Sequence, residues 1–194
     1  MMNLQANSAN VEIIIIKWEV AAVTDNGWQD FLSKIGKYNN PWDKGLFQVY
    51  GNLCAYEQNS LLYIGKAEDS FAVRLLNNSR RRGGFLETTA EPLTIRLGWI
   101  VKNNKYQNQT IEEEENWNRY IDVAEDVLVS THTPALNSQF SYNLYKFGEK
   151  YKDGNYLIIN WGDRGNLLPE VSTLRNTYRF EDYETPFGWN ERRI

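Results

Sequence analysis

Two short runs rich in apolar and aromatic residues stand out in the first third of the chain, at 45–51 and 61–66. The polar stretch 52–60 separates them, and each run contains a glycine at or near its end. This arrangement predicts two neighbouring antiparallel strands joined by a hairpin with a longish loop. A third run with an alternating start, 93–101, is expected to join the hairpin. The pattern therefore predicts a small three-stranded antiparallel sheet.

Helical spacing of apolar residues follows the second strand. Residues 71–78 predict a helix of about ten residues, with Asp69 or Ser70 as its N-cap. A longer helix is predicted from residue 111 to about 130, with an apolar stripe at Trp117, Ile121, Ala124 and Leu128. The predicted class is α/β (α+β), with the three-stranded sheet as its centre and helices flanking it.

The two ends of the chain carry further elements. Residues 11–23 predict a strand and 28–35 a helix, which we expect to form an extra layer packed on the central sheet. Residues 156–161 predict a strand, and 167–176 a short helix started by Pro169. The predicted organisation is an N-terminal extension at 1–44, a core at 45–137 and a C-terminal extension of unknown role at 138–194.

Composition narrows the class of protein. The net charge of −4 argues against a protein that coats nucleic acid non-specifically, although it leaves room for a local basic groove. A single cysteine, Cys54, excludes an intrachain disulfide, and a single histidine, His132, excludes a His-rich zinc site. The apolar run within 11–20 is too short for a bilayer, which needs about 20 apolar residues. We expect no membrane contact and a cytoplasmic location.

The segment 61–82 is basic within this acidic chain. It contains five Lys or Arg residues and two acids, a net charge of 5 − 2 = +3. The basic residues are Lys66, Arg74, Arg80, Arg81 and Arg82. Three arginines at the end of a helix also suit the helix dipole on a solvated face. The pattern fits such a face and a phosphate-contacting patch about equally well.

One acid of the long predicted helix differs from the others. Glu125 lies four residues past Ile121 and three before Leu128, so it borders the face that packs on the sheet. A partly desolvated carboxylate needs a cationic partner, either a side chain or a metal ion. Glu125 is therefore a candidate functional residue.

These pieces, in this order, resemble the GIY-YIG nuclease superfamily over residues 45–137. Tyr63-Ile64-Gly65 matches the second half of the signature, and Gly45-Leu46-Phe47-Gln48-Val49 resembles the first half. Arg74, eleven positions after Tyr63, is close to the family's arginine on the first helix. Glu125 and, twelve positions later, Asn137 resemble its metal-binding glutamate and terminal asparagine.

The resemblance implies a metal-dependent endonuclease that hydrolyses DNA with one Mg²⁺, or Mn²⁺, per site. Glu125 would hold the ion, and Arg74 would bind the phosphate oxygens. Tyr63 would orient or deprotonate the attacking water, with its pKa lowered by neighbouring cations. Asn137 would hold the end of the metal-bearing helix, and Lys66 is a further candidate for phosphate contact.

Two positions depart from the family pattern. Phe47 stands where the family usually has its first tyrosine, and Asn78 stands where it often has a His or Tyr. Tyr50 is a candidate to replace the missing hydroxyl, although three residues along a strand it should face the other way. Asn78 and Arg80, Arg81 and Arg82 are candidates for contact with nucleic acid.

Three functions remain open from the sequence. The first is the endonuclease, with or without a homodimer to cut both strands. The second is a catalytically impaired protein that serves as a nucleic-acid-binding or interaction module, which Phe47 and Asn78 favour. The third is an RNA-binding sheet that uses Phe47, Tyr50 and Tyr63 for stacking, which leaves Glu125 unexplained.

Overall fold

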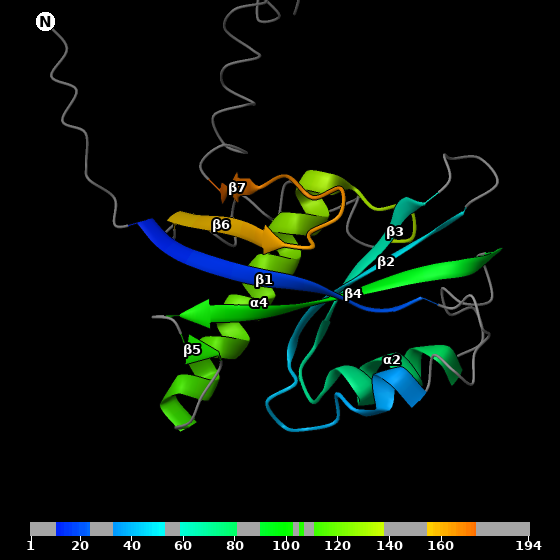
Figure 1. The fold of residues 1–194 in the computed structure, drawn as a ribbon. Helices are drawn as coiled ribbons and strands as arrows, with labels where there is room; N and C mark the ends of the chain where they lie inside the picture. The colour runs from blue at the N-terminus through cyan, green and yellow to red at the C-terminus, as the bar shows by residue number, and fades with distance from the viewer. Residues whose placement is uncertain are drawn as a thin grey trace, which may run out of the picture.

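The computed structural model describes seven parts of the chain: residues 11–23, 33–52, 59–80, 90–102, 105–106, 111–137 and 155–173. They form one sheet with the helices α2 (Phe71–Arg80) and α4 (Ile111–His132) and a short helical turn at residues 33–36 (Figure 1). The strands are β1 (Val11–Val23), β2 (Gly45–Asn52), β3 (Ser60–Ala67), β4 (Ala90–Lys102), β5 (Lys105–Tyr106), β6 (Asn155–Gly162) and β7 (Glu170–Ser172).

The sheet is mixed, with strand order β3-β2-β4-β1-β6-β7 and β5 paired beside β4. All pairs are antiparallel except β1 with β6, which run parallel. The sheet curls into a half-barrel. Strand β3 forms one edge of this path and β7 the other.

The prediction of a small three-stranded sheet flanked by helices was wrong. The three predicted strands do pair side by side as β3-β2-β4, but the sheet continues through β1, β6 and β7. Strand β1 is thus not part of an extra layer, because its backbone pairs with β4 and β6 along its length. The predicted helix at 167–176 is also wrong in part, because Glu170–Ser172 pairs with β6 as β7.

Burial explains why these segments form strands. In β1 the residues Ile14, Ile16 and Trp18 are buried while their neighbours Ile13 and Glu19 point away from the core. This alternation is the signature of a strand with one face on the core. Strand β2 is buried at every position from Gly45 to Gly51, since elements cover both of its faces.

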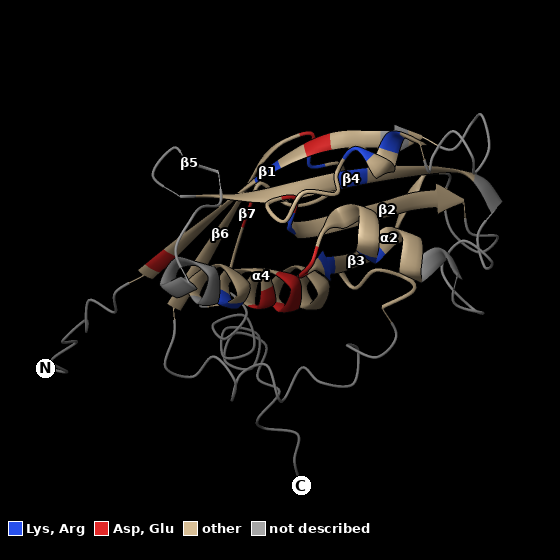
Figure 2. Cartoon of the chain, turned by 90° about the horizontal axis from the view of Figure 1, so that it is seen from below, with Lys and Arg blue, Asp and Glu red and all other residues tan. Residues whose placement is uncertain are grey.

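Two groups of buried side chains pack on opposite faces of the sheet. The larger group joins α4 to β1, β3 and β6 and includes Trp18, Ile64, Ile121 and Leu128. The smaller group lies between α2 and the β2–β3–β4 part of the sheet and includes Phe47, Phe71 and Leu75. The two helices therefore flank the β3 edge from different sides, as Figure 2 shows.

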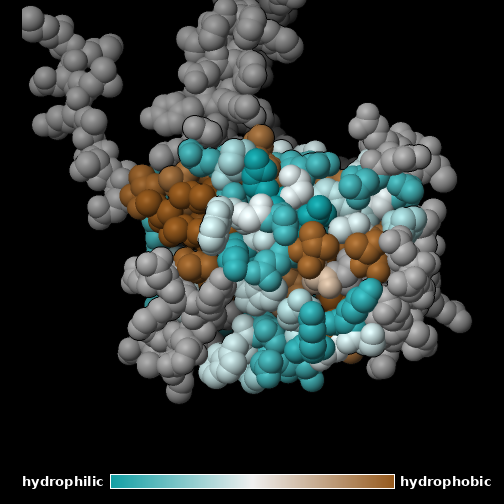
Figure 3. All heavy atoms as spheres, viewed as in Figure 1, coloured by the Kyte–Doolittle hydropathy of each residue, from teal (hydrophilic) through white to brown (hydrophobic). Residues whose placement is uncertain are grey.

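An apolar patch remains on the outer face of the parallel pair β1 and β6 (Figure 3). Val11 and Ile13 are exposed there, and their neighbours Leu157 and Ile159 are half-buried. Among the described helices none is long and apolar enough to cross a membrane.

Candidate functional site

Tyr63 lies on the edge strand β3, on the face that carries Phe47 and Val49. Its ring is 5.8 Å from the ring of Phe47, centroid to centroid. Gly65 makes this contact possible, because a Cβ at that position would lie 2.5 Å from the Tyr63 ring and 2.8 Å from Phe47. The glycine of the predicted signature thus has a steric reason to be there.

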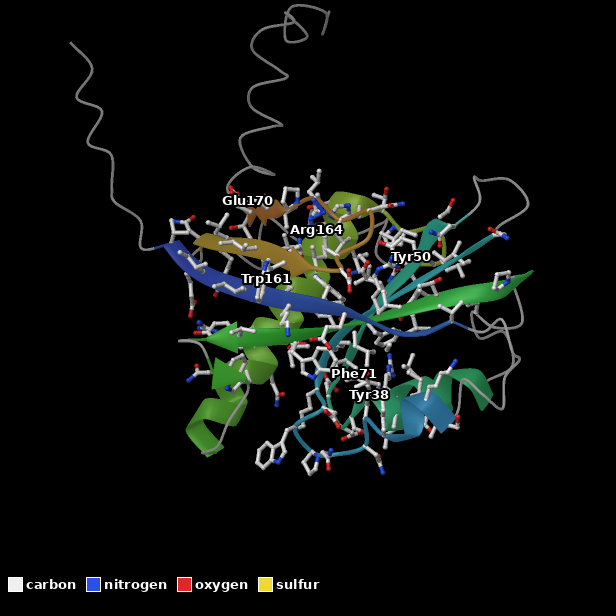
Figure 4. All side chains as sticks on the ribbon, in the orientation of Figure 1. Tyr38, Tyr50, Phe71, Trp161, Arg164 and Glu170 are labelled. Carbon is white, nitrogen blue, oxygen red and sulfur yellow. The ribbon has the colours of Figure 1, made fainter. Side chains whose placement is uncertain are left out.

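Arg74 comes to Tyr63 from the first turn of α2. Ser70 caps this helix, since its Oγ accepts a hydrogen bond from the Val73 backbone N–H at 3.2 Å. Phe71 anchors the helix by an edge-to-face contact with Trp99, with ring centroids 5.3 Å apart. Tyr38 lies beside the same ring of Trp99, and Figure 4 labels Phe71 and Tyr38 together below the sheet.

The guanidinium of Arg74 is only partly used by the protein. It makes a side-chain hydrogen bond with Tyr63. Its Nε is buried and has no hydrogen-bond acceptor among the described residues. A buried N–H without an acceptor is costly, so this atom needs one. The oxygen of an incoming phosphate group is an acceptor of the right kind.

Glu125 approaches the same place from α4 and is only 7% exposed. Burial raises its pKa to about 7; the charges of Lys66 and Arg74 oppose this, and those of Asp126 and Asp122 add to it. Glu125 is thus a buried acid surrounded by both signs of charge.

Glu125 also acts on Tyr63, which joins the three residues into one site. Burial raises the pKa of Tyr63, the Glu125 carboxylate raises it further, and Arg74 lowers it. Arg74 therefore lowers this pKa as expected, but burial and Glu125 outweigh it, so the expectation of a lowered pKa for Tyr63 was wrong for the protein without a bound ion. Its phenol is protonated at neutral pH.

Lys66 lies next to the site, but its ammonium group already forms ion pairs with two acids. Its Nζ is 2.5 Å from Asp122 Oδ1 and 2.6 Å from Glu68 Oε1. Burial alone would lower the pKa of Lys66, but the hydrogen bonds with Asp122 and Glu68 outweigh it and raise the pKa above its usual range. Lys66 fits a role in holding Asp122 better than one in binding phosphate.

Asn137 ties the end of α4 to the free edge of β3. Its Nδ2 donates to the Ile64 carbonyl at 2.8 Å, and its Oδ1 accepts from the Ile64 N–H at 2.9 Å. The Leu136 N–H also donates to the Leu62 carbonyl at 2.8 Å. The segment after α4 thus occupies the backbone groups of the edge strand. Asn137 therefore holds the end of the helix that carries Glu125 against β3.

Tyr50 and His132 lie away from this group, and the side chains of the other predicted contact residues are outside the described part of the chain. Tyr50 lies on the opposite face of the sheet, where its hydroxyl donates to Gln48 Oε1 at 2.6 Å. Asn78 and Arg80 belong to the last turn of α2, while Arg81 and Arg82 lie outside the described residues. His132 is at the far end of α4, where burial lowers its pKa to about 4 and its Nε2 accepts from the Leu168 N–H at 3.4 Å.

Asp122 belongs to the site and was not predicted. It lies one helical turn before Glu125 and pairs with Lys66. The spacing of three residues on the predicted helix was visible in the sequence, but the partner on β3 was not.

Within the described part of the chain, no group of three or more His, Cys, Asp or Glu side chains could hold a metal ion. Of the described residues, Glu125 is the one that the resemblance assigns to a metal ion.

Comparisons of the chain with protein-family models, with curated proteins and with solved structures found no match. The geometry of the site is thus the main ground for a functional proposal.

Proposed function

We propose that this chain is a metal-dependent endonuclease that hydrolyses DNA phosphodiester bonds. One observation carries the proposal: Tyr63 from β3, Arg74 from α2 and Glu125 from α4 act on one another at the sheet edge. These residues are far apart in sequence, so a shared neighbourhood requires the fold. A phenol, a guanidinium and a carboxylate are the groups that the resemblance to GIY-YIG nucleases assigns to this chemistry.

Glu125 suits a single Mg²⁺ or Mn²⁺. Its carboxylate is buried, and Asp122 one helical turn away is paired with Lys66. Magnesium is commonly bound by one or two carboxylates and several waters, which fits one available acid. When bound, the ion would supply Lewis-acid stabilisation of the leaving oxygen.

Arg74 supplies the phosphate contact. Its buried Nε has no described acceptor, and the hydrogen bond with Tyr63 holds the guanidinium in place. A planar guanidinium fixed in this way can donate to non-bridging oxygens of a phosphodiester. It would oppose the negative charge that develops on those oxygens during the reaction.

Tyr63 orients the attacking water. Its raised pKa keeps the phenol protonated at neutral pH, so it holds water by hydrogen bonding and does not remove its proton. The buried Phe47 packs on its ring and has no hydroxyl to share this task.

A second candidate is a nucleic-acid-binding module that has the site but no longer cuts. Phe47 favours it, because the ring is fully buried at the position where the resemblance expects a tyrosine. In this case Arg74 would still bind phosphate, and Glu125 would have no catalytic role.

Incubation of supercoiled plasmid with the purified chain and Mg²⁺ or Mn²⁺ separates the two. We expect nicking by the native protein and little or none by Glu125→Ala or Arg74→Ala. Arg119→Ala is the matched control, because Arg119 lies on α4 and pairs with Glu12 away from the site. If the native protein binds DNA without nicking it, the binding module is the better assignment. If Arg74→Ala and Glu125→Ala change neither nicking nor binding, both proposals fail.

A further inference from the structure

A second group of polar residues lies on the sheet face opposite to Tyr63. Gln48 on β2 and Arg96 on β4 are direct partners across the two strands, so their side chains point to the same face. Tyr50, two residues along β2, lies on this face as well, and the Arg96 guanidinium carbon is 4.6 Å from its ring centroid. We call Gln48, Tyr50 and Arg96 the Arg96 cluster.

The cluster contains buried hydrogen-bond donors that lack acceptors. The Gln48 side chain is 0% exposed, and its Oε1 accepts from the Tyr50 hydroxyl at 2.6 Å. Gln48 Nε2 and both Nε and Nη1 of Arg96 are buried and have no partner among the described residues. All three atoms are donors, so what the cluster lacks is an acceptor.

The charges around the cluster are positive. Burial raises the pKa of Tyr50, while the hydrogen bond from Asn166 and the charges of Arg96 and Arg164 lower it. No carboxylate is among these influences, and the ion pairs of the described residues do not include Arg96. A guanidinium with two buried nitrogens and no counter-charge is unfavourable, so an anion would be preferred there over a neutral acceptor.

The loop between β6 and β7 covers the cluster. The Asn166 N–H donates to the Tyr50 hydroxyl oxygen at 2.9 Å. Gly165 has φ +60°, and a Cβ there would lie 2.3 Å from that oxygen, so the loop backbone passes close to the ring. Figure 4 shows Arg164 on this loop and Tyr50 on β2. Gln48 and Tyr50 are buried, but Arg96 is only half-buried. A small molecule would therefore reach the cluster from the exposed part of Arg96.

We propose that the Arg96 cluster binds a small oxyanion, such as inorganic phosphate or a carboxylate group, beneath the β6–β7 loop. The anion would accept hydrogen bonds from Arg96 and from Gln48 Nε2. It must be small, because the unpaired donor atoms are all buried. This site goes beyond the proposed nuclease site, since Gln48 and Arg96 lie on the sheet face opposite to Tyr63.

Calorimetric titration of the purified chain with phosphate, sulfate and acetate tests the proposal. Two sites have unpaired arginine nitrogens, so the variants must separate them. In Arg74→Met the nuclease site loses its donor, and we expect the titration to retain oxyanion binding by the Arg96 cluster. In Arg96→Met that binding should weaken at least tenfold. Comparison of phosphate with acetate shows which oxyanion the cluster prefers.

A second measurement guards against a variant that merely misfolds. Methionine preserves much of the apolar contact with Tyr50 and removes the unpaired donors, so Arg96→Met should fold and melt no lower than the native chain in buffer without oxyanions. Saturating phosphate should raise the melting temperature of the native chain by about 5 °C or more, and that of Arg96→Met by much less. In Gln48→Met, phosphate should raise the melting temperature by an amount between those of the native chain and Arg96→Met.

Two results would overturn the proposal. One is undiminished oxyanion binding in Arg96→Met, which would assign all binding to other residues. The other is a native chain that binds none of the three anions, which would mean that water satisfies the donors. Neither result bears on plasmid nicking, so failure here is distinguishable from failure of the proposed function.

Discussion

Tyr63 and Tyr50 are two tyrosines of one hairpin that face opposite sides of the sheet, Tyr63 half-buried and Tyr50 fully buried. Burial raises the pKa of both phenols. Their neighbours differ, however. Tyr63 is influenced by a carboxylate and a guanidinium, whereas among the described residues the charges that act on Tyr50 are those of Arg96 and Arg164.

The difference shows that the charged neighbours of a tyrosine determine which ligands its site can bind. A site with charges of both signs can accept a cation on its carboxylate and an anion on its guanidinium at once, as metal-dependent phosphodiester hydrolysis requires. A site with cations alone can bind an anion but cannot hold a metal. The same residue type on the same two strands therefore supports two different proposals.

The largest expected effect is on catalysis at the site of Tyr63, Arg74 and Glu125. Glu125→Gln and Arg74→Met should each lower the nicking rate by about 100-fold or more, because each removes charge stabilisation in a partly dry site. Tyr63→Phe should lower it less, by roughly tenfold to 100-fold. The rates come from plasmid nicking under single-turnover conditions, and equal rates in all variants would remove the catalytic assignment.

The next largest effect is on stability, through the hydrogen bonds that hold the end of α4 on β3. Asn137→Ala should lower the free energy of unfolding by about 3–4 kcal/mol, because it leaves the backbone N–H and C=O of Ile64 without their buried partners. Urea denaturation measures this. Asn77→Ala on the exposed side of α2 is the matched control and should change stability by less than about 0.5 kcal/mol.

The raised pKa of Glu125 predicts a dependence of stability on pH. Between about pH 4.5 and 7 the unfolded chain releases this proton and the folded chain keeps it, so the free energy of unfolding falls as pH rises. Glu125→Gln removes this fall and should stabilise the protein at pH 8 by about 2–3 kcal/mol, with no gain below pH 4.5. The same deprotonation is needed for metal binding, so nicking should rise with pH through about 7.

Thermal denaturation at pH 4, 6 and 8 with the native chain and Glu125→Gln checks the sign. A stabilisation by Glu125→Gln that is equal at all three pH values would contradict the assigned pKa. Added Mg²⁺ should stabilise the native chain and leave Glu125→Gln unchanged.

The smallest effect concerns the loop over Tyr50. Gly165→Ala should lower the free energy of unfolding by about 1–2 kcal/mol, since φ is +60° and the new Cβ would press on the buried Tyr50 hydroxyl. Chemical denaturation measures it, and plasmid nicking should be unchanged. A Gly165→Ala protein as stable as the native chain would show that the loop does not pack on Tyr50 as described.

Local patterns in the sequence were enough to predict some parts of this fold. The hairpin of β2 and β3 is close in sequence, and its apolar runs and loop identify it. The wider sheet could not be predicted in this way. Strand β1 pairs with β6, whose residues are about 140 positions away, and apolar periodicity does not indicate which strands become neighbours. Likewise, Pro169 suggested a helix start, but pairing with β6 makes Glu170–Ser172 a strand.

The candidate sites show the same limit. Tyr63, Arg74 and Glu125 were found together through their order and spacing within a resemblance, and no single residue would have been enough. Asp122 was missed because its partner Lys66 is known only from the fold. Gln48 and Arg96 were missed because a buried polar residue in a strand looks like an exposed one until its neighbour across the sheet is known.

A double-mutant cycle on the nicking rate tests the central claim, that Arg74 and Glu125 act at one reacting phosphate. Native chain, Arg74→Met, Glu125→Gln and the double variant are compared with Mn²⁺ at one pH. Residues of one catalytic unit are not additive, so the double variant should be about as slow as the slower single variant. A double variant slowed by the product of the two single effects would contradict the claim, as would a native chain that does not nick DNA at all.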